Sequence, residues 1–163
     1  MKIIVHKSVK NSLLKLKAFF VHFDNQGKIL ADGNRNQIKV FDLEGTKVTV
    51  KRFKIPNLVN KIAYQYFRKS KAQRSYEYAC TLLDKGILTP FPIGYATESN
   101  GIFFGKSYYA CKLVEADATF RTLINEEDFP NRIEILKAFT RFTYEMHEKQ
   151  IHFLDHSAGN TLI

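Results

Sequence analysis

The sequence has few cysteines, no long apolar run and no cluster of metal-ligating side chains. Its two cysteines, Cys80 and Cys111, lie inside apolar segments, which predicts buried free thiols rather than a disulfide. No stretch approaches the roughly 18 apolar residues that a transmembrane helix requires. Among the five histidines only His152 and His156 are close together, and no cysteine joins them. This composition argues against a spanning helix, a disulfide scaffold and a metal centre.

The beginning of the sequence also lacks the features of a secretion signal. The stretch MKIIVHKSVKNSLLKLKAFF places lysine in every apolar patch and has no cleavage site of small residues. We therefore expect a cytoplasmic protein. No block of like charges and no internal repeat occurs, and 163 residues predict one domain, or one and a fraction.

Positive charge is in excess. The chain carries 25 Lys and Arg against 16 Asp and Glu, a net charge of +9. Such a surface suits a phosphate-rich partner, whether nucleic acid, nucleotide or an anionic membrane surface. Lysines that only confer solubility explain the charge equally well. Fourteen Phe and eight Tyr provide a large supply of core aromatics.

The sequence pattern predicts strands in the first third of the chain. Residues 1–12 give no clear signal, and residues 13–23 fit a strand or a helix. Residues 29–54 predict a β-meander, with Ile38, Val40 and Leu43 near alternate positions and a tight turn at Glu44-Gly45.

The period then changes to that of a helix over residues 55–86. Ser70 is a candidate N-cap, and Gly86 closes the helix as the C′ residue, so the segment is one helix or two with a bend near Ser70. Glu77 stands one position from the apolar stripe, which places it at the edge of the buried face. The stripe consists of Ala72, Tyr76, Ala79 and Leu83.

Strand patterns return over residues 87–116, and helices follow. TFRTLI is a short helix candidate, and residues 126–150 form the clearest helix, with Asp128 as its cap and Pro130 in its first turn. Its apolar stripe is Ile135, Phe139, Phe142 and Met146. Strands grouped before helices in this order predict an α+β fold.

Four features that carry chemistry occur in a fixed order. Lys51 stands on a strand, Glu77 on the next helix, and a connector follows the last strand. After the long helix comes DHSAGN, where Asp155 and Asn160 are five residues apart. A loop carboxylate can accept a proton from an attacking hydroxyl, and a loop amide oxygen can ligate Mg²⁺.

This order resembles the signature set of protein kinases: VTVK resembles V-A-I-K, and LDHSAGN resembles the catalytic loop H-R-D-L-x-x-x-N. The closer resemblance is to the bacterial lipopolysaccharide kinases of the Kdo/heptose family. The matching stretches are GNRNQIKVF, VTVKRFKIPNLVNKIAY, SKAQRSYEYA, GILTPFPIGY and HFLDHSAGNTLI, which span residues 27–163.

The resemblance implies ATP and Mg²⁺ as cofactors and a role for each matched residue. Lys51 would hold the α- and β-phosphates, and Glu77 would fix Lys51. Asp155 would deprotonate the acceptor hydroxyl, and Asn160 would bind the metal. Gly33 and Arg35 would lie against the phosphates, and backbone groups of the connector, Val114, Glu115 and Ala116, would bind the planar base.

It also implies a domain layout: an N-lobe over residues 1–112, with an antiparallel sheet and one αC-type helix, a hinge over 113–117, and the start of a helical C-lobe over 118–163. The pattern departs from the family at three points. Gly33 is the only glycine of the phosphate-covering loop, Phe153 stands where His is expected, and no D-F-G segment follows. We therefore expect a truncated kinase chain, and both an active and an inactive chain fit this pattern.

The family transfers the γ-phosphate of ATP to a sugar hydroxyl of the lipid A inner core, at the cytoplasmic face of the inner membrane. We expect that acceptor or another small hydroxyl compound, an anionic membrane surface as a further partner, and self-association through the long helix. A kinase-like module that binds a nucleotide or a partner without catalysis is the alternative. An RNA-binding domain that stacks bases on Phe103, Phe104, Tyr108 and Tyr109 ranks third, so we expect no nucleic acid.

Overall fold

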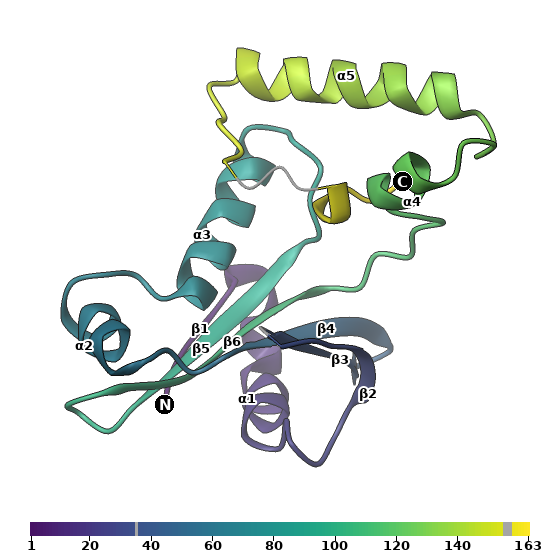
Figure 1. Ribbon diagram of the computed structural model, residues 1–163. Helices are drawn as coiled ribbons and strands as arrows, with labels where there is room; N and C mark the ends of the chain where they lie inside the picture. Colours follow the sequence, from purple (N-terminus) through teal and green to yellow (C-terminus); the bar gives the residue numbers. More distant parts are fainter. Residues whose placement is uncertain (35, 155–157) are drawn as a thin grey trace. The chain divides into compact units, whose positions relative to one another are not determined.

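The computed structural model describes residues 1–34, 36–154 and 158–163 (Figure 1). The chain divides into two compact units, Met1–Leu113 and Val114–Ile163. The first unit contains β1 (Lys2–Val5), η1 (Lys7–Ser12), α1 (Leu13–Val21), β2 (Lys28–Asp32), β3 (Asn36–Leu43), β4 (Thr46–Phe53), α2 (Leu58–Tyr66), α3 (Lys71–Asp84), β5 (Pro92–Ser99) and β6 (Phe104–Lys112).

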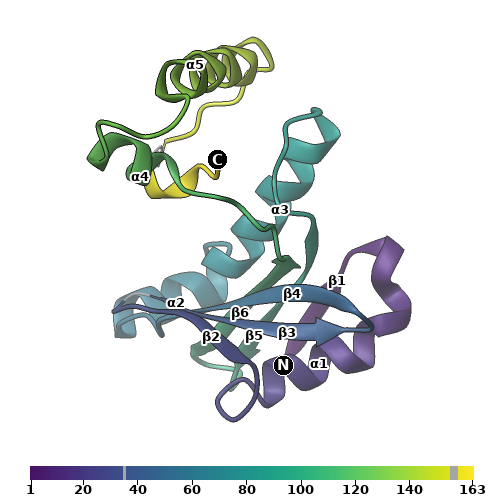
Figure 2. The same cartoon turned by 90° about the vertical axis from the view of Figure 1, so that its right-hand side faces the viewer.

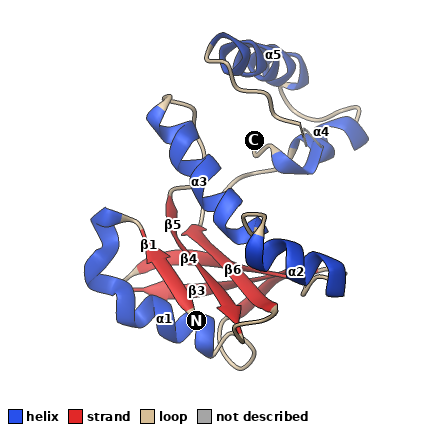
Figure 3. Cartoon of the chain, turned by 90° about the vertical axis from the view of Figure 1, so that its left-hand side faces the viewer, coloured by secondary structure: helices blue, strands red, loops and turns tan. Residues whose placement is uncertain are grey.

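Over the described residues, the strands form one six-stranded antiparallel sheet in the order β1-β5-β6-β4-β3-β2. The meander predicted for residues 29–54 is confirmed, because β2, β3 and β4 pair in succession. Strand β1 was not expected from the sequence; it is short and pairs only with β5. Figure 2 shows the twist of the sheet, and Figure 3 shows the helices around it. This α+β arrangement is compatible with a kinase-like N-lobe.

One face of the sheet is closed by α1, so most of the ambiguous residues 13–23 form a helix, which ends at Val21. Leu16, Phe20 and Phe23 are fully buried against Val48 and Tyr108. The rings of Phe20 and Tyr108 stack with 5.5 Å between centroids. Burial of these large apolar side chains is the main stabilising contribution of this face.

A buried lysine interrupts the expected alternation of β3. Lys39 is only 6% exposed, and its Nζ donates to the main-chain oxygens of Phe23 at 2.7 Å and of Asp24 and Gln26 at 3.1 Å. The buried positions of β3 are therefore 39, 41 and 43. Ile38 and Val40 lie on the opposite face from Leu43, so their grouping with Leu43 was wrong.

The turn and cap predictions for the first unit are confirmed. Glu44 and Gly45 both have positive φ, as a two-residue hairpin turn requires, and Asp42 accepts the amide of Gly45. Helices α2 and α3 are separated at Ser70, whose side chain accepts the Gln73 amide. Gly86, with φ of 68°, ends α3.

The second unit contains α4 (Phe120–Asn125), α5 (Arg132–Glu148) and η2 (Ala158–Asn160). The short helix at TFRTLI is confirmed as α4. The last residues return beside its start: Thr119 and Leu162 form an isolated antiparallel bridge, and the amide of Ile163 donates to Ala118 at 2.9 Å.

The expected start of the long helix was wrong. Helix α5 begins after Asn131, which has φ of 54°, and residues 127–130 form turns instead of a capped first turn. The predicted apolar stripe is partly covered: Met146 is buried, and Phe139 stacks on Phe120 with 4.0 Å between ring centroids. Self-association through this stripe stays a prediction.

Cys80 and Cys111 are free thiols and are half-buried rather than buried. Within the part of the chain that the structure describes, none of the helices has the length and apolar character that crossing a bilayer requires.

Candidate functional site

The face of the sheet opposite α1 carries a row of polar side chains across three central strands. Tyr95 of β5 lies directly opposite Tyr109 of β6, and Tyr109 lies directly opposite Lys51 of β4. Directly opposed residues of antiparallel strands project to the same face. The register therefore places Lys51 in one row with two tyrosines, on the face that α3 covers.

Helix α3 packs on this face through a small aromatic cluster. Ala72 is fully buried against Phe53 and Tyr95, and the rings of Tyr76 and Tyr95 lie 5.5 Å apart. Ala72 and Tyr76 are one helical turn apart, so the sequence periodicity that predicted the stripe is confirmed. The packing fixes which side of α3 meets the sheet.

Glu77 follows directly after Tyr76 and is held by two donors. Lys69 Nζ donates to its carboxylate at 2.8 Å, and Gln73 Nε2 at 2.9 Å. The hydrogen bond from Lys69, followed by the one from Gln73, lowers the pKa of Glu77, and Glu77 raises the pKa of Lys69. Glu77 is therefore a preorganised anion at the edge of the face.

The negative charge of Glu77 reaches the tyrosine row. Burial raises the pKa of Tyr95, and the charge of Glu77 raises it further. Glu77 was predicted to sit at the edge of the buried face, and its side chain is 35% exposed, which confirms that position. The sequence did not reveal its partners, because Lys69 lies eight residues away across the break between α2 and α3.

Lys51 is half-buried on β4, where the prediction placed it. Its Nζ lies over the ring of Phe53, 5.3 Å from the ring centroid, and it makes a further contact. Its positive charge also lowers the pKa of the Cys111 thiol, although burial outweighs it and leaves that pKa raised. A half-buried ammonium at the end of a tyrosine row provides a localised positive charge next to an aromatic surface.

Neutral hydroxyl and thiol groups surround Lys51. Burial raises the pKa of Tyr109, with Cys111 adding to the effect, and burial raises that of Tyr76 to about 12. Thr49 Oγ1 and Cys111 Sγ are 3.1 Å apart. These tyrosines therefore stay protonated at neutral pH, and the charged groups described on this face are Lys51, Glu77 and Lys69, the partner of Glu77.

The loop predicted to cover phosphates joins β2 to β3. The amide of Gly33 donates to the Asn36 oxygen at 3.0 Å, which closes a tight connection. A hollow of about 370 Å³ lies beside it and includes Gly33, Asn36, Arg52, Lys54 and Lys106. Arg35 lies outside the described residues. Arg52 and Lys106 both pair with Asp24, and Asp32 also lines the hollow, so the positive charge of its three cations is partly neutralised.

The remaining predicted residues belong to the second unit. Val114, Glu115 and Ala116 form an extended connector without regular structure, and Glu115 makes a contact of its own. Asn160 ends η2 and also has a partner. Asp155 lies outside the described residues. The roles assigned to these residues, and the hinge at 113–117, stay predictions.

Comparisons with known proteins add one similarity. No protein-family model and no curated protein matches the sequence. A solved structure described as WaaP in complex with acyl carrier protein aligns with 90% of this chain and 57% of that chain, with a TM-score of 0.51 and 15% identity. This chain therefore spans a little over half the length of the WaaP chain.

At this identity the match shows a shared fold. Among the described residues, no group of three or more His, Cys, Asp or Glu side chains is placed to hold a metal ion.

The RNA-binding alternative loses part of its support. Phe104 and Tyr108 are both buried in β6, where they cannot stack on bases.

Proposed function

We propose that this protein binds Mg·ATP on the α3 face of its sheet and transfers the γ-phosphate to a hydroxyl group of a lipid A inner-core sugar. The observation that carries the proposal is the joint placement of Lys51 and Glu77. One is a half-buried strand lysine and the other a fixed helical carboxylate, on a sheet and helix that share the fold of WaaP.

The residues of the first unit fit the binding of a triphosphate. Lys51 offers one localised cation, and protonated Thr49 and Tyr109 beside it bring no competing negative charge. Glu77 would orient Lys51 when the nucleotide is bound, as the kinase resemblance implies. Such a pair holds the α- and β-phosphates in place, and phosphoryl transfer depends mostly on positioning and charge.

The proposed chemistry is an in-line displacement. The acceptor oxygen forms a bond to the γ-phosphorus, the bond from that phosphorus to the bridging oxygen of ATP breaks, and ADP leaves. The hydroxyl proton passes to the carboxylate of Asp155. Asn160 would hold Mg²⁺, which neutralises charge on the phosphates when bound.

An assay of γ-phosphate transfer tests the proposal. Labelled ATP would be mixed with the full chain and a lipid A acceptor that carries Kdo or heptose. We expect transfer by the natural chain, loss of at least about 100-fold with Asp155→Asn, and no loss with the control Asp128→Asn, an exposed turn residue. Nucleotide binding without any turnover would favour a non-catalytic kinase-like module instead.

A further inference from the structure

The segment from Lys54 to Lys71 combines positive charge with exposed apolar side chains. It holds five basic residues and no acidic one, whereas the whole chain has a net charge of +9. The five are Lys54, Lys61, Arg68, Lys69 and Lys71. More than half of the excess charge is therefore concentrated in about a tenth of the sequence, around helix α2.

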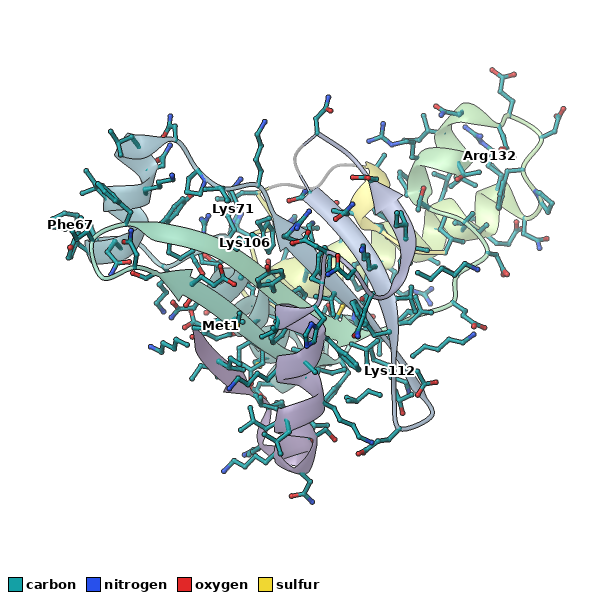
Figure 4. All side chains as sticks on the ribbon, turned by 90° about the horizontal axis from the view of Figure 1, so that it is seen from below. Met1, Phe67, Lys71, Lys106, Lys112 and Arg132 are labelled. Atoms are coloured by element: carbon teal, nitrogen blue, oxygen red, sulfur yellow. The ribbon has the colours of Figure 1, made fainter. Side chains whose placement is uncertain are left out.

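The apolar side chains of α2 form a stripe that the rest of the first unit leaves exposed. Leu58, Ile62 and Tyr66 follow one another at four-residue intervals, so they share one side of the helix. Leu58 is 61% exposed, and Phe67, just past the helix end, is 82% exposed. Figure 4 shows Phe67 projecting at the outer end of this segment and Lys71 further along it.

Two contacts hold α2 against the strands. The ring of Tyr64 lies 5.7 Å from that of Phe104 on β6. Tyr66 Oη donates to the Gly101 oxygen at 3.3 Å, which ties the helix end to the β5–β6 hairpin. Ile102 at that hairpin is 61% exposed and extends the apolar stripe. The surface thus comes from two anchored elements.

We infer that this surface, the α2 patch (Leu58, Ile62, Tyr66, Phe67 and Ile102 with the five basic residues), docks the protein on an anionic lipid bilayer. Helix α2 contains one of the five basic residues, Lys61, and the other four lie in the segments on either side of it. An amphipathic helix with such basic flanks and no acidic residue can lie in the plane of the membrane interface, with its apolar side among the upper acyl chains. Tyrosine is favoured at that depth, and long lysine and arginine side chains reach back to the phosphates.

Charge complementarity favours an anionic bilayer over a second copy of this chain as the partner of the α2 patch. A second copy of this chain would bring the same five cations to the same surface, and like charges would oppose the contact. A bilayer rich in anionic lipid attracts these cations, although Lys69 already pairs with Glu77 and contributes less than the other four. The inference does not depend on phosphate transfer, because it uses none of the residues proposed for that step.

Vesicle flotation of the full chain tests the inference. We expect binding to vesicles of phosphatidylcholine with 30–40% phosphatidylglycerol, roughly the anionic content at which surface potential becomes strong, and release at high salt. Vesicles of phosphatidylcholine alone should bind far more weakly. No binding to the anionic vesicles, or equal binding to both kinds, would overturn the inference.

Matched variants separate the patch from the general charge of the surface. Leu58→Ser with Phe67→Ser should lower the apparent affinity at least about 100-fold, because two large apolar side chains leave the membrane. Arg68→Gln with Lys71→Gln should lower it about 30-fold. The controls Leu14→Ser with Leu88→Ser, and Lys7→Gln with Lys10→Gln, change equally exposed residues elsewhere and should lower it less than about threefold.

A fluorescent variant adds a readout of depth. The chain has no tryptophan, so Phe67→Trp creates a single probe on the patch and Leu88→Trp a single probe outside it. Only Phe67→Trp should shift to shorter wavelength with anionic vesicles and be quenched by brominated lipid. Equal fluorescence responses of the two tryptophan variants would contradict the inference. It would also be contradicted if the patch variants kept full vesicle binding and lost only a dimer, or only binding to acyl carrier protein.

Discussion

Two lysines on neighbouring strands of one sheet have opposite surroundings. Lys39 of β3 faces α1, is 6% exposed and donates to three main-chain oxygens at the end of that helix. Lys51 of β4 faces α3, is half-buried and lies among neutral hydroxyl, thiol and aromatic groups. The first lysine completes a core, and the second presents a cation on a face with a fixed carboxylate at its edge.

The comparison indicates that the two faces of the sheet have different roles: the α1 face stabilises the fold, and the α3 face carries the groups proposed to bind a ligand. The α1 face is a buried aromatic core in which the buried Lys39 donates to three main-chain oxygens. The α3 face is lined by tyrosines and by the Cys111 thiol, whose pKa values are raised by burial, so that these groups stay neutral. Substitutions on the α1 face should therefore change the free energy of unfolding, and substitutions on the α3 face should change ligand binding.

The largest expected effect is on the α1 face. Phe20→Ala removes a ring that is 1% exposed and stacked on Tyr108, and should lower the free energy of unfolding by about 3–5 kcal/mol. Tyr109→Phe on the other face keeps the ring and should cost less than about 1.5 kcal/mol. Urea unfolding followed by circular dichroism measures both. Equal losses would remove the distinction between the faces.

The two lysines provide the next contrast. Lys39→Met leaves three carbonyl oxygens at the end of α1 without their donor and should lower the free energy of unfolding by about 2–3 kcal/mol. Lys51→Met should cost less than about 1 kcal/mol, because its ammonium is half-exposed to water. The same unfolding measurement applies. A larger loss from Lys51→Met than from Lys39→Met would contradict the division.

The smallest effect concerns pH. Lys69 and Gln73 lower the pKa of Glu77 from its ordinary 4.5. The unfolded chain then binds more protons than the native one as the pH falls below that value, so the stabilisation by Glu77 is complete above about 5 and disappears in acid. Because Glu77 is partly exposed, the effect should stay below about 1 kcal/mol.

A comparison with Glu77→Gln isolates this pH effect. The natural chain should be more stable than the variant at pH 7 and equal to it near pH 3, as measured by urea midpoints. Glu44→Gln is the control: Glu44 also has a lowered pKa, through Lys15, but it lies in the β3–β4 turn. It should show the same pH trend and leave nucleotide affinity unchanged. A difference for Glu77→Gln that persists at pH 3 would contradict the assignment.

Local sequence patterns predicted much of the fold. The turn at Glu44-Gly45, the cap at Ser70 and the end of α3 at Gly86 are correct because each depends on a few adjacent residues. The predicted start of α5 was wrong. Asn131 has a left-handed conformation, so the helix begins only at Arg132. The pattern of β3 was misread at Lys39, since a buried lysine needs three distant carbonyl groups that no local pattern shows.

The candidate site was only partly predictable for the same reason. The sequence placed Lys51 on a strand and Glu77 at a helix edge, and both positions are confirmed. The row from Lys51 through Tyr109 to Tyr95 depends on the register of three strands, which are far apart in the sequence. The hydrogen bond from Lys69 to Glu77 depends on the direction in which the chain turns between α2 and α3. Neither the row nor this hydrogen bond can be recognised from a local sequence pattern.

The most direct test of the central claim is calorimetry of Mg·ATP binding to the full chain, to Lys51→Met and to the control Lys17→Met, an exposed lysine on α1. The account predicts binding by the natural chain and by the control, and affinity at least about tenfold weaker with Lys51→Met, because the cation for the phosphates is lost. Equal affinity in all three proteins would contradict the assignment of the α3 face, and no binding by the natural chain at millimolar nucleotide would contradict nucleotide binding itself.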